Sequence, residues 1–125
     1  WQKRGAEEER DYAIFTAEIS KAAFGMTPSE YKDFKGLNRQ NLRDHMNDLE
    51  LIFSMLGERA TTEITQVEDS KGVPKLKSDA KRGGDIAGGA RRKLEKEIKH
   101  PILSNKKLHE HEAKKNLFKS TYKPF

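Results

Sequence analysis

Cysteine is absent from the 125-residue sequence, so disulfides and thiolate metal sites are excluded. Long apolar runs are also absent, and nothing approaches the roughly 18 consecutive apolar residues that a membrane-spanning helix needs. No basic segment followed by an apolar one opens the chain, as a secretion signal would. We therefore expect a cytoplasmic protein that does not enter a membrane. Because the chain opens with Trp1 rather than methionine, we also expect it to be a fragment of something longer.

Apolar residues are scarce relative to charged ones, at 34% against 36% of the sequence. The length suits one domain with one core, and a chain of this size has little surplus apolar surface to bury. This polar balance favours elongated helices, an oligomer, or both, over a thick core.

The two parts of the chain carry opposite charge. Residues 1–70 contain 9 Lys/Arg and 14 Asp/Glu, a net charge of −5, whereas residues 71–125 contain 16 and 6, a net charge of +10. Such asymmetry is typical of a basic arm for nucleic acid or of two parts that attract each other. Solvated helix faces that happen to differ in sign are the plainer alternative.

Two helices are predicted in the first 36 residues. Apolar residues at three- and four-residue spacing predict a helix over 6–24, which Gly25 would cap. Thr27 and Glu30 form a capping box around Pro28, which predicts a short helix that ends at Gly36. We expect the aromatic residues of this short helix, Tyr31 and Phe34, to face inward.

A third helix is predicted from Asn38, its cap, to about residue 67. Its apolar residues follow a nearly heptad pattern: Leu42, Met46, Leu49, Phe53, Leu56, Ala60 and Ile64. The apolar stripe is widened by three more residues, Leu51, Ile52 and Met55. A stripe this wide indicates contact with more than one neighbour, so we expect this helix to be the centre of the fold. Gly57 in its interior is expected to mark a close helix crossing. The pair Arg43 and Asp44 is interpreted as a surface pair or as a polar anchor to a neighbouring helix.

The rest of the chain is predicted to be helical apart from short connections. Gly72 and Pro74 indicate a loop over 69–77, and Ser78 is the expected cap of a fourth helix that runs to about Lys99. Residues 105–119 could form a fifth, basic helix. The pattern predicts an all-α fold of four or five helices, with intertwining in an oligomer left open. We divide the chain into a helical module, 1–104, and a basic helical tail, 105–125.

The segment 81–97, KRGGDIAGGARRKLEKE, poses the central question, because four glycines lie within seven residues. A phosphate-binding loop would need a preceding strand and Lys-Ser/Thr after the second glycine, but Gly89 and Ala90 stand there. On a helix, Gly84 and Gly88 join Ala80 in a stripe of small residues that lets another backbone approach closely. Apolar residues at four-residue spacing form the rest of the expected packing or partner interface: Ile86, Ala90 and Leu94.

The same segment carries a basic face. Lys81, Arg82, Arg91, Arg92 and Lys96 could neutralise phosphates on a nucleic acid. The alternative is a set of solvated side chains paired with nearby glutamates at helical spacing. Aromatic residues that would stack on single-stranded bases are missing here.

No enzyme, metal or cofactor site is recognisable. His109 and His111 in HEHE are two residues apart, so they do not share a helix face as zinc protease ligands do. No carboxylate lies in a pattern that indicates acid–base catalysis. We therefore expect a protein without catalytic activity and without a cofactor.

Four stretches of the sequence, in order, resemble a known family: WQKRG, YAIFTAEISKAAFGMTPSEYKDFKGL, NLRDHMNDLELIFSMLGERATTEI and GGDIAGGARRKLEKE. Together they resemble the C-terminal half of bacterial and prophage proteins of the BRO-N type, including prophage antirepressors and DNA-damage-inducible protein D-like proteins. The resemblance covers roughly residues 1–104 and implies a regulatory, non-catalytic role. In that family an upstream BRO-N domain is thought to bind DNA. Gly89, the segment IKHPILSNKK and residues 105–125 depart from the family pattern.

Two functions are therefore carried forward. The first is an interaction or oligomerisation module of a prophage or damage-response regulator, with a protein partner that is a second copy, a repressor or a DNA-repair protein; a homo-oligomer is expected. The second is a nucleic-acid-binding module that uses the basic face of residues 81–99 and the basic tail.

Overall fold

The structure, a computed structural model, describes residues 1–6 and 8–105. These residues form four α-helices, α1 (Glu9–Phe24), α2 (Pro28–Phe34), α3 (Asp48–Glu68) and α4 (Val73–Ile98), and two single 3-10 turns, Gln2–Arg4 and Arg43–His45. No strand occurs among them, so the predicted all-α class is confirmed. The proposed fifth helix and the basic tail lie outside the described residues from position 106 onward.

The end of α1 and the start of α2 lie where the sequence predicts, whereas α1 begins at Glu9 and not at residue 6. Gly25 ends α1 in the left-handed conformation, with φ of 76°. The Thr27 hydroxyl accepts the backbone N–H of Glu30 at 3.2 Å, and the Glu30 carboxylate accepts the N–H of Thr27 at 3.0 Å. Tyr31 is fully buried, but Phe34 is 37% exposed, so the prediction that Phe34 faces inward is wrong.

Helix α3 begins nine residues later than the sequence predicts. Asn47, not Asn38, is its cap: the Asn47 side chain accepts the Glu50 N–H at 2.8 Å, and the Glu50 carboxylate accepts the Asn47 N–H at 3.0 Å. Between them, Arg43–His45 makes only one 3-10 turn. Met46 is nevertheless buried in the core, because the loop carries its side chain there.

Helix α4 begins six residues earlier than predicted, at Val73 rather than after Ser78. Pro74 lies in the first turn of α4. Proline is tolerated there because the N–H groups of a first turn have no acceptor within the helix. The cap is Gly72, with φ of 82°, and its N–H donates to the carbonyl oxygen of Arg4 at 2.6 Å. This bond ties the N-terminal turn to the α3–α4 connection.

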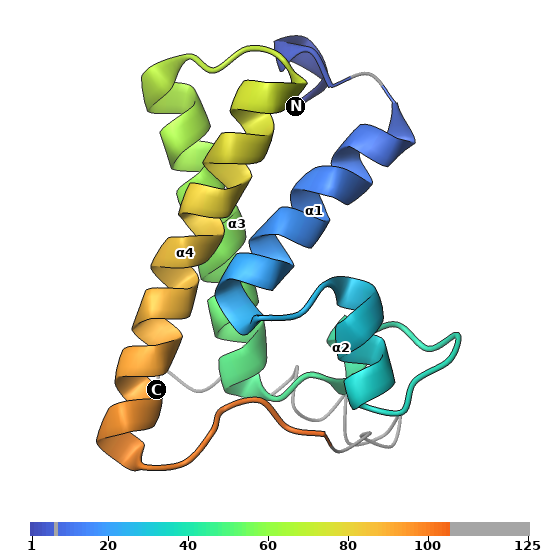
Figure 1. The fold of residues 1–125 in the computed structure, drawn as a ribbon, viewed down its shortest axis with the longest axis vertical. Coiled ribbons are helices and arrows are strands. Elements are labelled where there is room, and N and C mark those ends of the chain that lie inside the picture. Colours follow the sequence, from blue (N-terminus) through green and yellow to red (C-terminus); the bar gives the residue numbers. More distant parts are fainter. Residues whose placement is uncertain (7, 106–125) are drawn as a thin grey trace.

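Helix α4 is the shared partner of the fold. It packs along both α1 and α3, whereas α1 and α3 touch over a much smaller contact (Figure 1). The central helix is therefore α4 and not, as the sequence suggested, α3. Helix α2 lies across the end of the bundle where α1 ends and α3 begins.

The core has two parts, one on either side of the helix crossing. One lies between α1, α4 and the N-terminal turn and contains Ala6, Phe15, Ile19, Leu76 and Ala80. The other lies beneath α2 and contains Ala23, Phe24, Tyr31, Met46, Leu51, Phe53, Ala87 and Ile102. The second part takes a residue from the segment that follows α4, so this segment is part of the packed structure.

Candidate functional site

The small residues of α4 meet the backbone of α1. A Cβ atom built on Gly84 would lie 2.6 Å from the carbonyl oxygen of Ile19 and 2.7 Å from the Cβ of Ala22. One built on Gly88 would meet the carbonyl oxygen of Ala22 even more closely. Both glycines are buried. The close backbone approach that the small-residue stripe predicts is thus present, and it occurs within one chain.

The third helix joins the same crossing. A Cβ on Gly57 of α3 would lie 3.0 Å from Cγ2 of Ile19 and 3.5 Å from the Cβ of Ala87. On the other side of α4, a Cβ on Gly83 would clash with Thr61 of α3. Gly57 therefore marks a close crossing, as expected, and the contact of Thr61 with Gly83 fixes the antiparallel register of α3 and α4.

The apolar residues predicted alongside the glycines point elsewhere. Ile86 is 51% exposed, Ala90 is exposed, and Leu94 is half-buried against the core part beneath α2. Steps of four residues rotate by about 40° around a helix, so this line crosses α4 diagonally from solvent to core. Whether these side chains form an interface with a partner stays a prediction.

Two of the predicted nucleic-acid contacts are engaged in ion pairs within the chain. Arg82 Nη1 lies 2.8 Å from a Glu68 carboxylate oxygen, and Lys81 Nζ lies 3.4 Å from Asp85. Lys75 joins Glu68 to Asp79, which is buried and accepts the Thr65 hydroxyl at 2.9 Å. Burial pushes the pKa of Asp79 up, but hydrogen bonds led by that of Lys75 hold it below its ordinary value.

Arg91 lies inside the fold rather than on the basic face. Only 8% of it is exposed; its Nε donates to the Ala23 carbonyl oxygen at 2.7 Å, and Nη1 pairs with Glu95 at 2.7 Å. The other Glu95 oxygen accepts the Ile102 N–H at 2.9 Å. Arg91 thus joins the last turn of α1 to α4, a role that no local pattern in the sequence indicates.

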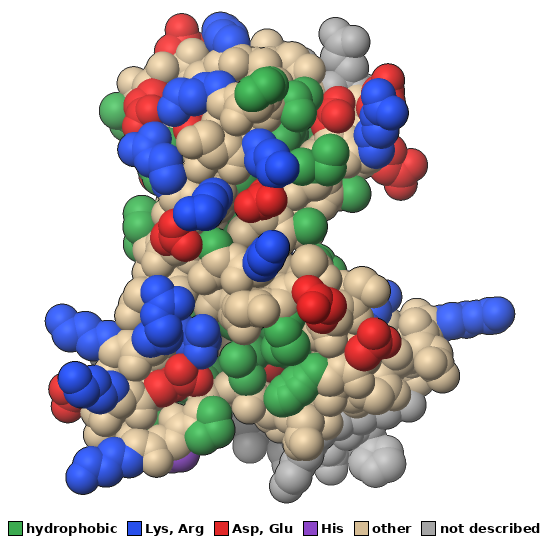
Figure 2. Space-filling model, viewed as in Figure 1, with side chains coloured by type: hydrophobic (Ala, Val, Ile, Leu, Met, Phe, Trp, Pro, Cys, Tyr) green, Lys and Arg blue, Asp and Glu red, His purple; other side chains and the backbone are tan. Residues whose placement is uncertain are grey.

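Arg92 and Lys96 occupy the solvent-facing side of α4, together with Lys93. All three are exposed, and no ion pair forms between them and any of residues 1–6 and 8–105. Basic side chains gather over the C-terminal half of α4 in Figure 2. Of the sequence-predicted contacts, Arg92 and Lys96 are therefore the ones left available to an external anion.

A buried polar network, which sequence reasoning missed, links α2 to the start of α3. Lys35 Nζ pairs with Glu50 Oε1 at 3.0 Å, and neither side chain has any exposed surface. The Tyr31 hydroxyl donates to the other Glu50 oxygen. Burial raises the pKa of Glu50 to about 7 and lowers the pKa of Lys35 to about 8, because both groups lose hydration when charged.

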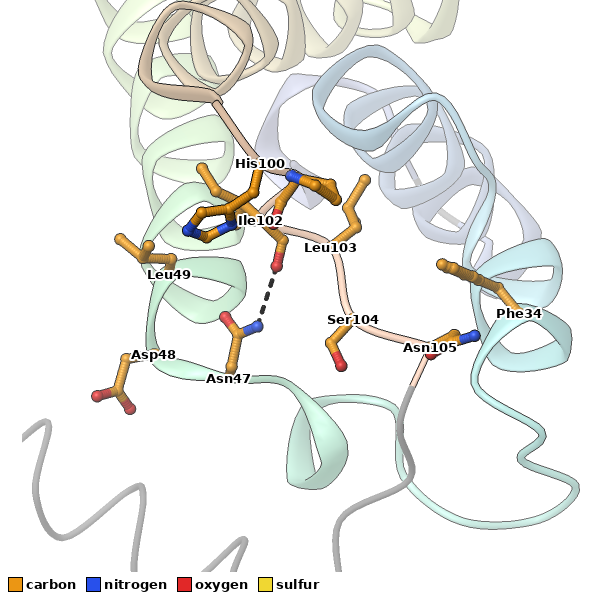
Figure 3. Close-up of a pocket in the computed structure, with 10 residues that line it drawn as sticks. Phe34, Asn47, Asp48, Leu49, His100, Ile102, Leu103, Ser104 and Asn105 are labelled. Carbon is orange, nitrogen blue, oxygen red and sulfur yellow. Dashed lines mark hydrogen bonds between the residues drawn. The ribbon is translucent and has the colours of Figure 1, made fainter. Parts of the chain in front are cut away.

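The network holds the segment that follows α4. Lys35 Nζ donates to the Ser104 carbonyl oxygen at 2.6 Å, and Asn47 Nδ2 donates to the Ile102 carbonyl oxygen at 3.0 Å, the dashed line in Figure 3. We call residues 101–105 the strap. Its backbone is bonded by three side chains: Lys35 after α2, Asn47 before α3 and Glu95 of α4. The buried Ile102 side chain anchors it in the core.

An open cavity of about 840 Å³ adjoins the strap, lined by Phe34, Asn47, Asp48, Leu49 and residues 100–105. In Figure 3 the Asp48 carboxylate is directed away from the strap, and the His100 ring lies over Leu49. The His100 Nδ1 atom is 2.9 Å from the Pro101 carbonyl oxygen. The lining also offers backbone groups and the side-chain amides of Asn47 and Asn105.

Metal and membrane sites are not found in the part of the chain that the structure describes. No group of three or more potential ligands is arranged to hold a metal ion there. His109 and His111 lie outside the described residues. No helix among those described combines the length and apolar character needed to cross a bilayer.

Comparison with protein-family models, curated proteins and solved structures gives no match to this chain.

Proposed function

We propose that this chain is a non-catalytic helical module through which a bacterial or prophage regulator, of the antirepressor or damage-response kind, associates with a second copy of itself. The regulatory setting rests on the sequence resemblance described above. The association rests on one observation, an apolar surface of α3 and α4 that no described residue covers.

This surface, the outer apolar strip, consists of Ile52, Leu56, Ala60 and Ile64 of α3 and Ile86 and Ala90 of α4. Ile52 and Ile86 are 53% and 51% exposed, and Leu56 is 37% exposed. The contacts Thr61–Gly83 and Gly57–Ala87 set the register, and helical geometry then places both sets on the same side of the α3–α4 pair. Helix α1 covers the opposite side. Contiguous exposed apolar surface of this kind is characteristic of interaction sites.

Charge favours a second copy as the occupant. Helix α3 has five acidic and one basic side chain, a net charge of −4, and α4 has eight basic and four acidic, a net charge of +4. Glu63 lies two turns beyond Leu56, and Lys93 lies two turns beyond Ile86, so both exposed charges border the strip. A two-fold arrangement that sets α3 against the partner copy's α4 brings opposite charges together twice.

Sedimentation equilibrium on the whole chain tests this proposal. We expect the wild type to be a dimer, and we expect Leu56→Glu and Ile86→Glu each to weaken the dimer by about 100-fold or more, since each places two charges in an apolar contact. The matched control is Ile14→Glu, an exposed apolar residue of α1 on the far side, which should leave the dimer intact.

Circular dichroism on each variant checks that the helices remain. A wild type that sediments as a monomer at high concentration, with both strip variants behaving identically to it, would remove the proposal. A dimer broken equally by Ile14→Glu would move the interface to α1.

Nucleic-acid binding remains a second candidate because Arg92, Lys93 and Lys96 are exposed without intramolecular ion pairs. Duplex binding should weaken steeply with salt, and replacing these three residues by alanine should lower the salt slope by roughly three. The control is Arg82→Ala, which removes a cation already paired with Glu68. Absence of binding at low salt, or binding unchanged in the triple variant, argues against this function.

A further inference from the structure

Helices α1 and α3 diverge, and a trough opens between them on the side away from the outer apolar strip. The trough is a cavity of about 570 Å³, within the range of small-molecule sites. Its floor is apolar and consists of the core residues Ile19, Phe24 and Met46, which are at most 6% exposed. Trp1 lies at one end of the trough, and residues of α2 and the 41–46 loop close the other.

The closed end carries the polar groups. Lys32 of α2 lines it and forms no ion pair with the described residues. Arg43 lines it too, on a 3-10 turn whose first N–H is accepted by the Asn41 side chain at 2.9 Å. Arg43 Nη2 donates to Ser54 at 3.3 Å and to the Glu58 carboxylate, which fixes the guanidinium against α3.

We propose that this trough binds a small elongated monocarboxylate, such as a medium-chain fatty acid or an aryl-alkyl acid. The apolar body would lie along Phe24, Met46 and Ile19 toward Trp1, and the carboxylate would lie at the closed end between Lys32 and Arg43. This site is separate from the outer apolar strip and does not depend on the proposed self-association.

The charges of the lining side chains favour an anionic head group over a cationic one. Among the residues that line the trough, Arg43 and Glu58 neutralise each other and Lys32 leaves one positive charge. The two oxygens of a carboxylate can accept two parallel hydrogen bonds from a guanidinium such as that of Arg43. An ammonium group would be repelled by Lys32 and Arg43, and the one anion of the lining, Glu58, is already paired with Arg43. A single acid group with an apolar chain therefore fits the trough better than an amine or a dicarboxylate.

Fluorescence gives a direct readout, because Trp1 is the only tryptophan in the sequence and it lines the trough. Titration of the whole chain with octanoate should shift the emission of Trp1 saturably. Octanol and octylammonium are the matched probes that keep the chain and change the head group. We expect each of them to bind at least tenfold more weakly than octanoate.

Two substitutions test the head-group contacts in opposite directions. Lys32→Met should weaken octanoate binding by about tenfold, since it removes the unpaired cation. Glu58→Gln should strengthen it several-fold, because Arg43 loses the anion that competes with the ligand. A purely structural role for the Arg43–Glu58 pair predicts no gain for Glu58→Gln. Lys93→Met, a cation on the exposed side of α4, is the control and should change nothing.

The proposal is overturned if the emission change is not saturable, if octanol binds as tightly as octanoate, or if Glu58→Gln weakens binding in a chain whose circular dichroism is unchanged. Should Glu58→Gln fail to fold, Ser54→Leu fills the wall beside Arg43 and must abolish saturable binding. Sedimentation with octanoate separates this site from the interface: self-association should persist with the trough occupied, so loss of one does not imply loss of the other.

Discussion

Individual glycines of α4 differ in role although they are neighbours in the sequence. Gly84 and Gly88 face α1, Gly83 faces α3, and Gly89 has no atom within 4 Å of the position where a Cβ would stand. Space at each position is set by the backbone of the neighbouring helix and not by the glycine itself. The same substitution should therefore have opposite effects at Gly84 and Gly89, which are only five residues apart.

Gly84→Ala is expected to destabilise the fold by about 2–3 kcal/mol, because the new Cβ would clash with the Ile19 carbonyl, which is backbone and cannot rotate away. Gly89→Ala is the matched control. It should stabilise the fold by about 1 kcal/mol, since alanine is the better helix former and the site is open. Urea unfolding of both variants measures the difference, and a Gly84→Ala protein as stable as the wild type would contradict the close packing.

The Lys35–Glu50 pair makes a prediction about pH. The folded state raises the pKa of Glu50 from 4.5 to about 7, so it binds more protons than the unfolded chain between these values, and stability falls as pH rises through this window. The pKa of Lys35 falls from 10.5 to about 8, so stability contributed by this group rises again between pH 8 and 10.5. The pair is least favourable between about pH 7 and 8.

The double variant Lys35→Met/Glu50→Gln removes both titrating groups. The carbonyl oxygen of the new glutamine can still accept the Asn47 N–H, and its amide can donate to the Tyr31 hydroxyl. We expect the stability of the wild type, measured against this variant, to drop by on the order of 3 kcal/mol from pH 5 to 7 and to recover above pH 8. A difference that rises between pH 5 and 7 would show that attraction between the two charges outweighs their loss of hydration.

At the scale of helices, the sequence predicts those elements whose signals are local. Gly25 correctly marks the end of α1 and the capping box at Thr27 the start of α2, because the groups that bond to each other lie within four residues. The sequence predicts too early a start for α3 because Leu42 and Met46 continue its apolar spacing. The Asn47–Glu50 capping box was present in the sequence and outweighs that spacing, since a cap satisfies N–H groups that apolar side chains cannot.

The Arg91 side chain connects α4 to the last turn of α1, so its removal should destabilise the packing of that turn. Arg91→Met is expected to cost about 2–3 kcal/mol, because the buried Ala23 carbonyl and Glu95 lose a charged donor. Arg92→Met, one residue away and exposed, should stay within about 0.5 kcal/mol of the wild type. Thermal unfolding monitored by circular dichroism compares the two, and equal losses would contradict the buried role of Arg91.

For the whole molecule, the parts that could not be predicted are those joined only by tertiary contact. The fold class follows from helical periodicity, and close packing at Gly84 and Gly88 follows from their spacing. The residues next to Lys35 and Glu50 in the sequence do not indicate that both side chains are buried, because the two meet only in the folded chain. The strap is likewise too short to show periodicity, and its position depends on Lys35, Asn47 and Glu95 together.

Truncation tests the contribution of the strap. A chain that ends at His100 loses the buried Ile102 side chain and leaves Lys35 without the Ser104 carbonyl, so it should be less stable than a chain that ends at Asn105 by about 3–5 kcal/mol. Urea unfolding of the two truncated chains gives this difference directly. Equal stability would mean that the strap merely rests on the surface.

The glycine-rich helix also bears on how the protein is made. A chain leaves the ribosome N-terminus first, so α1, α2 and α3 emerge before α4, the helix against which α1 and α3 pack. Until then α1 and α3 have little to pack on, because their contact with each other is small. Helix α4, with four interior glycines, has little tendency to form alone and gains its helix only against the other two. Folding must therefore wait for nearly the entire described sequence. A nascent chain that stops within α4 would be left without a stable core and open to proteolysis.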